Sequence, residues 1–87
     1  MSAAEAVEIR AEEYDRDSGC EPLLLFWYVG PGQAVTVGQE LCEVESAKAV
    51  VVITAPASGV LSEVLVQEGE AVGSGQLLGR IIRPKEG

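Results

Sequence analysis

The 87-residue chain is predicted to fold as an all-β domain, a flattened β-barrel or sandwich of two quasi-symmetric four-stranded halves. Its apolar runs are short and are separated by ten glycines and four prolines, which is typical of strands joined by tight turns. No segment carries a convincing helical period of apolar residues. In addition, residues 32–46 recur in similar form 37 residues later, as residues 69–83.

The internal repeat keeps its glycines and its apolar positions in register. Each copy reads as a strand, a turn, a short strand, a second turn and a further strand. Neither copy can cover its own apolar face, so we expect the two halves to pack against each other around a quasi-two-fold axis. Val29 matches Val66 just upstream, and six positions within the copies are identical: Gly32/Gly69, Ala34/Ala71, Val35/Val72, Gly38/Gly75, Gln39/Gln76 and Leu41/Leu78.

The N-terminal third is predicted to contain an edge strand, a polar loop and a second strand. Apolar and polar residues alternate over Val7–Ala11, which favours the edge strand. The Ala and Glu content of Ala3–Glu13 leaves a short helix as the alternative. Asp15–Pro22 is polar and is expected to be a loop, and Leu23–Val29 is expected to be a strand.

Between the two copies, Ala49–Thr54 is strongly β-branched and is predicted to be a strand. Pro56–Gly59 ends it, because Pro lacks a donor for the ladder and Gly permits a turn. Val60–Val66 is expected to be the next strand. The prediction is a single domain over residues 1–87, with a core of about 7–83 and with 84–87 as a tail or the start of a linker.

Two aromatic residues and two cysteines are expected to have structural roles and not to form a binding or reactive site. Trp27 and Tyr28 are neighbours in a strand and should face opposite ways, one toward the core and one toward solvent. Cys42 is expected to be a small buried residue and Cys20 an exposed loop residue. No metal-ligand spacing relates the two cysteines, and we expect two free thiols in a reducing cytoplasm.

The charge and composition exclude several classes of function. The formal net charge is −8, from 14 acidic and 6 basic residues, which disfavours nucleic acid and anionic membranes as partners and favours solubility. Most of the carboxylates are expected to form a solvated acidic face, and a basic docking surface on a protein partner is the alternative. Histidine is absent, so the usual general base and zinc ligand are missing. No segment is long and apolar enough for a membrane span, and the start of the chain lacks signal-peptide features.

Lys48 is the candidate functional residue. It is one of only two lysines, and strand-like sequence on either side predicts that it lies at the tip of a hairpin. A lysine held out on a rigid base suits an enzyme that acylates amines, whereas the simpler interpretation is an unmodified surface lysine in a turn. The surrounding motifs favour the modified lysine.

Three motifs, taken together, resemble the biotinyl/lipoyl carrier domain family, on its lipoyl branch. Glu45-Ser46-Ala47-Lys48-Ala49 is similar to the lipoyl signature of Glu, Thr or Ser, Asp, the modified Lys and Ala. Gly32-Gln33-Ala34-Val35-Thr36-Val37-Gly38 is similar to the Gly-x-x-Val-x-x-Gly run before it, and Pro56-Ala57-Ser58-Gly59-Val60-Leu61 to the Pro-x-x-Gly run after it. The resemblance covers about residues 7–83 and implies the barrel-sandwich hybrid fold.

The resemblance implies a covalent cofactor and a set of residues read by the modifying enzyme. Lys48 would carry lipoate in amide linkage, attached by a lipoate ligase or lipoyl transferase. The loop Asp15–Pro22 would lie near the lysine, where a partner dehydrogenase inspects the domain. Ala47 departs from the family pattern, which has Asp at this position. The turn therefore lacks a side chain that can bond to its own backbone. The residues expected to be read during modification are Glu45, Ser46, Ala47, Ala49, Gly32 and Gly59.

By the same resemblance, the chain would be a monomeric carrier without catalytic residues of its own. Its partners would be a thiamine-dependent 2-oxo acid dehydrogenase, an acyltransferase and dihydrolipoyl dehydrogenase, between whose active sites the arm would shuttle acyl groups and reducing equivalents. Three alternatives remain: a biotin carrier, which the absence of Met on both sides of Lys48 disfavours; a glycine-cleavage carrier, which has additional helical sequence; and an unmodified hammerhead interaction module, which Ala47 favours.

Overall fold

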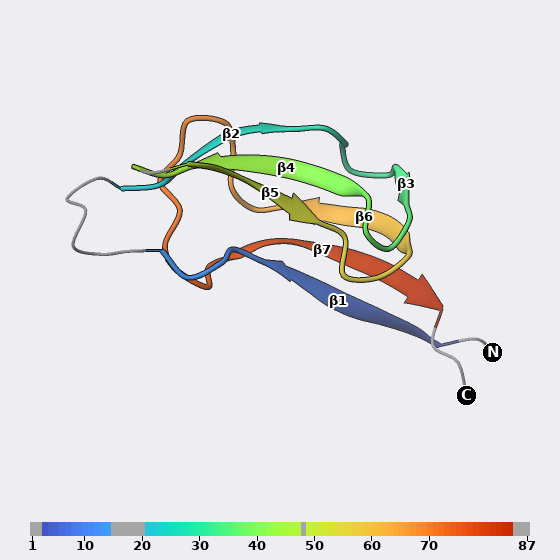
Figure 1. Cartoon of the computed structure of the whole chain (residues 1–87). Coiled ribbons are helices and arrows are strands. Elements are labelled where there is room, and N and C mark those ends of the chain that lie inside the picture. The colour runs from blue at the N-terminus through green and yellow to red at the C-terminus, as the bar shows by residue number, and fades with distance from the viewer. Residues whose placement is uncertain (1–2, 15–20, 48, 85–87) are drawn as a thin grey trace.

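A computed structural model describes residues 3–14, 21–47 and 49–84, and these residues form seven strands and no helix (Figure 1). The alternating segment near the N-terminus is therefore a strand and not a short helix. The strands are β1 (Ala4–Arg10), β2 (Leu23–Trp27), β3 (Ala34–Val35), β4 (Glu40–Glu45), β5 (Val50–Thr54), β6 (Gly59–Val64) and β7 (Leu77–Pro84).

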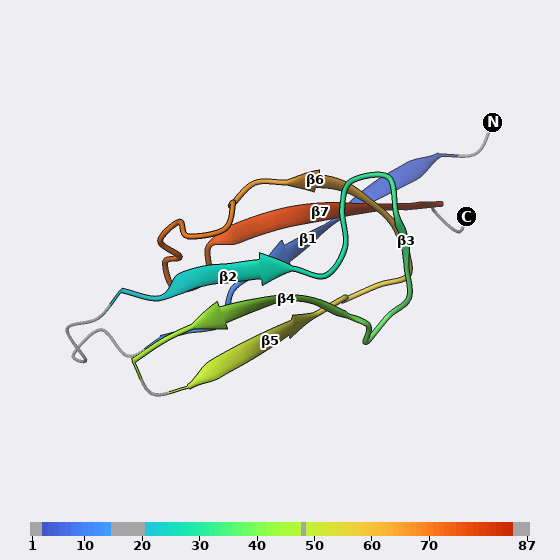
Figure 2. The ribbon, with the colours of Figure 1, turned by 90° about the horizontal axis from the view of Figure 1, so that it is seen from above.

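The strands form two antiparallel sheets that face each other along the long axis of the molecule (Figures 1 and 2). One sheet has the order β1-β7-β6-β3 and the other has the order β2-β4-β5. The molecule measures 50 × 20 × 19 Å, so the sandwich is long and narrow. β1 is an edge strand, as the alternation of its residues predicts.

The quasi-two-fold relation between the halves is confirmed by their backbone hydrogen bonds. The amide of Leu61 donates to the carbonyl of Gln33 at 2.9 Å, and the equivalent amide of Leu24 donates to the carbonyl of Glu70 at 3.0 Å. Each of these contacts crosses from one half to the other. The two copies are therefore interlocked, and each supplies the outer edge of the sheet formed by its counterpart.

The glycines that match between the two copies of the repeat are required by the backbone conformation. Among the described residues, the positive-φ glycines are the four that match between the copies, at φ 92° for Gly32, 86° for Gly38, 84° for Gly69 and 68° for Gly75. A side chain is strained in this region of backbone conformation, so glycine permits both turns in each copy.

The two sheets differ in how far the fourth strand extends. β3 pairs with β6 over two residues, whereas the equivalent segment of the second copy touches β2 through a single bridge between Ala71 and Leu23. The β-branched Thr36 that follows β3 is replaced by Gly73 in the second copy, which favours extended structure less. The predicted four-stranded halves are thus a sheet of four strands and a sheet of three strands with one bridge.

The core is built from equivalent side chains of the two halves. Leu24 and Leu61, Leu41 and Leu78, and Val44 and Ile81 are related by the repeat, and all six are fully buried. Each pair covers the apolar face that a single half would expose, which is the main stabilising contribution in a domain of this size.

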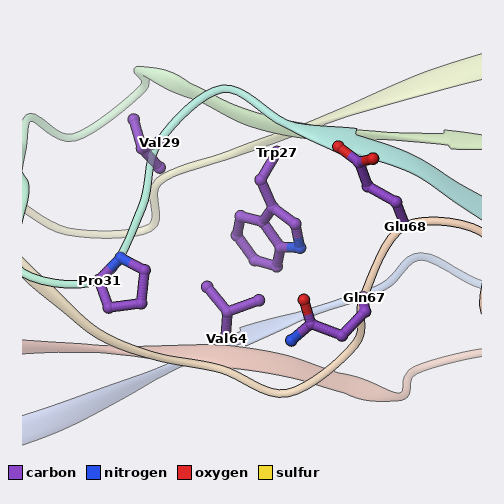
Figure 3. Close-up of a pocket in the computed structure, with 6 residues that line it drawn as sticks. All are labelled: Trp27, Val29, Pro31, Val64, Gln67 and Glu68. Atoms are coloured by element: carbon purple, nitrogen blue, oxygen red, sulfur yellow. The ribbon is translucent and has the colours of Figure 1, made fainter.

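Trp27 and Val64 also occupy equivalent positions, and they meet at the seam between the halves. Figure 3 shows both side chains directed into one open pocket, with Val29, Pro31, Gln67 and Glu68 around it. The indole Nε1 of Trp27 donates to the carbonyl of Val66 at 2.9 Å, while the neighbouring Tyr28 is exposed. The opposite orientations expected for the two aromatic residues are confirmed.

Candidate functional site

The candidate site is the connection between β4 and β5. Glu45 pairs with Val50 as the last rung of the two strands. Beyond it, the carbonyl of Ala49 accepts two hydrogen bonds from Ser46, one from the backbone amide at 2.9 Å and one from Oγ at 3.0 Å. The connection is therefore a tight turn closed by both the backbone and the side chain of Ser46. Lys48 belongs to this turn in the sequence and itself lies outside the described residues.

The strands that carry the turn are anchored on the core. Val44 is fully buried and Ile53 is 5% exposed, so the inner face of the hairpin is fixed by packing. The β-branched run of β5 favours the extended conformation that this packing needs. At the turn, by contrast, Ala47, Ala49 and Val50 are exposed. These exposed residues of the turn therefore lie on a base that is fixed by packing.

The hairpin lies at the opposite end of the sandwich from the start of β1 and the end of β7. Figure 1 shows the β4–β5 turn at one end, together with the end of β1 and the start of β2, and shows β1 beginning and β7 ending at the other. The predicted loop Asp15–Pro22 connects β1 to β2. Its residues 15–20, including Cys20, lie outside the described residues.

The structure brings together only four of the six residues expected to be read during modification. Glu45, Ser46 and Ala47 precede Lys48 at the turn and Ala49 follows it. Gly32 and Gly59 lie away from the turn, where Gly59 pairs with Val35 and the amide of Gly32 donates to the carbonyl of Leu61 at 2.7 Å.

Both of these distant glycines have structural roles. Gly32 has a positive φ, and Gly59 lies so close to β7 that a Cβ would collide with the carbonyl oxygen of Ile82 and meet Cγ2 of Ile81 at 2.8 Å. These constraints explain the glycines through backbone geometry.

The one described thiol is buried away from the turn. Cys42 is free and fully buried within β4, as the sequence predicts, and burial raises the pKa of its thiol from 9.0 to about 12. A thiol held protonated at neutral pH is a poor nucleophile, so its role is packing. Among the described residues, no three or more His, Cys, Asp or Glu side chains gather in a way that could hold a metal ion.

One exposed feature beside the hairpin was not singled out by the sequence. Phe26 lies on the outer face of β2 and packs edge-to-face against Tyr28, with 5.0 Å between the ring centroids. Extending the repeat alignment upstream pairs Phe26 with Glu63, and this mismatch is the signal that could have found it.

Across the described part of the chain, no helix has the length and apolarity needed to span a membrane.

One known protein family and several curated relatives match this chain. Residues 18–81 match the family described as "Biotin-requiring enzyme". The dihydrolipoyllysine-residue succinyltransferase component of the 2-oxoglutarate dehydrogenase complex is 34% identical over 76 residues in Pseudomonas aeruginosa, 38% over 65 in Escherichia coli (strain K12) and 39% over 74 in Bacillus subtilis. These alignments cover 87%, 75% and 85% of this chain but only 18%, 16% and 18% of the relatives. The chain thus spans less than a fifth of their length.

A solved structure matches the fold described above. The solution structure of the lipoyl domain of the 2-oxoglutarate dehydrogenase complex from Azotobacter vinelandii superposes with a TM-score of 0.64 at 29% identity, covering 91% of this chain and 98% of that domain. The two-sheet sandwich and the family match agree with each other. The chain therefore belongs to the biotinyl/lipoyl carrier domain family, and its sequence relatives and its fold place it on the lipoyl branch.

Proposed function

We propose that this chain is a lipoyl carrier domain that bears lipoate on Lys48 and serves a 2-oxo acid dehydrogenase complex. The observation that carries the proposal is the lipoyl-domain fold with the Glu45-Ser46-Ala47-Lys48-Ala49 motif on the turn of its β4–β5 hairpin. Because the curated relatives belong to the 2-oxoglutarate dehydrogenase complex, 2-oxoglutarate is the first 2-oxo acid to test.

The residues around the turn fit a covalently attached arm. Such an arm needs an amine, a rigid base and open solvent, and the exposure of Ala47 and Ala49 on either side of the attachment position supports this. When bound, the dithiolane of lipoate supplies the chemistry of accepting and passing on acyl groups and electrons. Acylation of Lys48 removes one positive charge and takes the formal net charge from −8 to −9.

The role of the protein is to orient and to restrict diffusion. Ser46 holds the turn closed through its two bonds to Ala49, and the buried inner face of the hairpin keeps the base of the arm rigid. A tethered group reaches successive active sites at high effective concentration, without diffusing away between steps. This role requires no catalytic residue in the carrier itself.

The modifying enzyme would be a lipoate ligase or lipoyl transferase, and the partners would be the thiamine-dependent dehydrogenase, the acyltransferase and dihydrolipoyl dehydrogenase. We propose that the enzyme reads Glu45, Ser46, Ala47 and Ala49 at the turn directly. Gly32 and Gly59 would contribute through the shape of the domain. Cytoplasmic localisation and a monomeric domain are part of the same proposal.

Intact-mass measurement of the chain from its native cells, followed by peptide mapping across Lys48, tests the proposal. The expected result is a lipoyl or octanoyl adduct on Lys48 and none on a Lys48→Arg variant. A biotin adduct would reassign the chain to the carboxylase carriers. An unmodified Lys48 in cells that lipoylate their other carriers would contradict the proposal and favour an interaction module.

A further inference from the structure

The outer face of the β2–β4–β5 sheet carries an exposed aromatic and acidic cluster, which we call the Phe26 patch and define as Leu23, Phe26, Tyr28, Glu43, Glu45 and Val50. The exposed fractions of its apolar members run from 37% for Phe26 to 48% for Val50. Phe26 is paired across the strands with Glu43, and the hydroxyl of Tyr28 donates to the carboxylate of Glu43. The cluster is therefore organised by its own contacts and not a scatter of single side chains.

The quasi-two-fold symmetry provides an internal reference for this face. The cross-strand pair Phe26–Glu43 corresponds to the pair Glu63–Arg80 in the other half, and both pairs follow a register shift at the same place in the ladder. In the other half this pair is an ion pair, with Arg80 Nη1 3.1 Å from Glu63 Oε2. The scaffold thus accommodates a wholly polar pair at these positions, and the exposed aromatic ring is not a requirement of the fold.

The two sheets also differ in charge balance. β1, β6 and β7 carry three glutamates and three arginines, which pair as Glu8 with Arg10 at 2.8 Å, Glu63 with Arg80 at 3.1 Å and Glu5 with Arg83 at 2.7 Å. β2, β4 and β5 carry three glutamates, and their sequences contain no Lys or Arg. The charges on β1, β6 and β7 cancel one another, whereas the sheet that carries the Phe26 patch has a net negative charge.

The patch continues directly into the lysine-bearing turn. Leu23, Glu45 and Val50 form the rung next to the turn, and Phe26 and Glu43 form a rung two residues further along β4, a step of about 7 Å. A protein bound to this face would have the turn at the edge of the interface. The patch is therefore placed to orient an arm on Lys48 toward a partner.

We propose that the Phe26 patch is the docking surface for the dehydrogenase component that acylates the arm, and that this partner contributes arginine side chains set among apolar groups. The proposal rests on the proposed carrier function. Arginine is the complementary group, because its guanidinium binds carboxylates and also stacks on aromatic rings. An encounter that recurs in every catalytic cycle needs fast association, which opposite charges provide.

A double variant tests the proposal by moving the ion pair of one half onto the other. Phe26→Glu with Glu43→Arg reproduces the Glu63–Arg80 pair and raises the net charge by one. Glu8→Gln on the opposite sheet is the control, because it raises the net charge equally and leaves the Phe26 patch intact. The wild type and the two variants are assayed in lipoylated form with the purified 2-oxoglutarate dehydrogenase component of the same cells, and in unmodified form with the lipoylating enzyme.

We expect the double variant to lose about tenfold or more in kcat/KM with the dehydrogenase, as for loss of an aromatic hot spot, and to be lipoylated at the wild-type rate. The control should react like the wild type, and the wild-type rate should fall with added salt. In parallel, amide chemical shifts of the ¹⁵N-labelled wild-type chain should move at the Phe26 patch when the dehydrogenase is added. This mapping does not depend on any variant folding.

The outcomes separate this proposal from the proposed function. Wild-type rates in the double variant, or shifts confined to other faces, would overturn the docking surface and leave the carrier function standing. Shifts at the Phe26 patch in a chain that is never lipoylated would retain the docking surface and reject the carrier. Concentration-dependent shifts at the patch without any partner would show that a second copy covers it, and would also overturn the proposal.

Discussion

At the scale of single residues, Gly59 shows how close packing constrains a position that has an ordinary backbone conformation. Substitution Gly59→Ala should destabilise the domain by about 1–3 kcal/mol, because its Cβ would collide with the backbone of β7 at Ile82. Gly30→Ala is the control, since no atom lies within 4 Å of its added Cβ and its φ is not positive. Urea unfolding measures the free energy of unfolding of both variants. Equal stability of the two would contradict the close packing of Gly59 against β7.

Cys42 gives a residue-scale prediction for alkaline pH. The folded pKa of about 12 lies above the ordinary value of 9.0, so only the unfolded chain loses the thiol proton between these values. The stabilisation from this residue is therefore fully present below pH 9 and is lost as the pH rises through about 12. The stability of the wild type relative to Cys42→Ala should fall over this range. A difference that stays constant with pH, measured by urea unfolding, would contradict the shift.

At the scale of the element, the β4–β5 hairpin combines a rigid base with a small turn. Ser46→Ala removes the Oγ bond to Ala49 and keeps the backbone bond, so the rate of lipoylation should fall by about two- to tenfold with little change in Tm. The loss follows from a turn that closes less often, while the core remains intact. Mass spectrometry of the lipoylation time course gives the rate.

The converse variant adds the turn bond that this chain lacks. Ala47→Asp introduces a side chain that can accept from its own turn backbone, so it should stabilise the turn and speed lipoylation. Ala47→Ser, a smaller and weaker version of the same change, should have a smaller effect. No gain from Ala47→Asp would mean that Ser46 already closes the turn fully.

At the scale of the whole molecule, the quasi-two-fold fold predicts that equivalent core substitutions are equivalent in energy. Leu41 and Leu78 are both fully buried at the same position of the repeat. Leu41→Ala and Leu78→Ala should each cost about 2–5 kcal/mol in the free energy of unfolding. Equilibrium unfolding in urea compares them, and a near-neutral result for one variant would show that the halves are packed unequally.

The symmetry of the molecule was predictable because local rules produce it. The glycines of the repeat occupy the turns, and the apolar positions between them, such as Leu41 and Leu78, must face inward in both copies. The hairpin at Glu45-Ser46-Ala47-Lys48-Ala49 was predictable for the same reason, since a β-branched strand follows it directly. These are properties of short segments, and the amino-acid order alone specifies them.

Sequence alone therefore determined the all-β class, the two related halves, the turn that bears Lys48 and the burial of Cys42. Only the tertiary structure decided which distant residues share a face. It separated Gly32 and Gly59 from the turn, and it gathered Phe26, Tyr28 and Glu43 on the outside of one sheet. The physical reason is that strand register and sheet pairing are set by contacts between segments far apart in the chain. The periodicity within one segment does not specify which strands will pair with it.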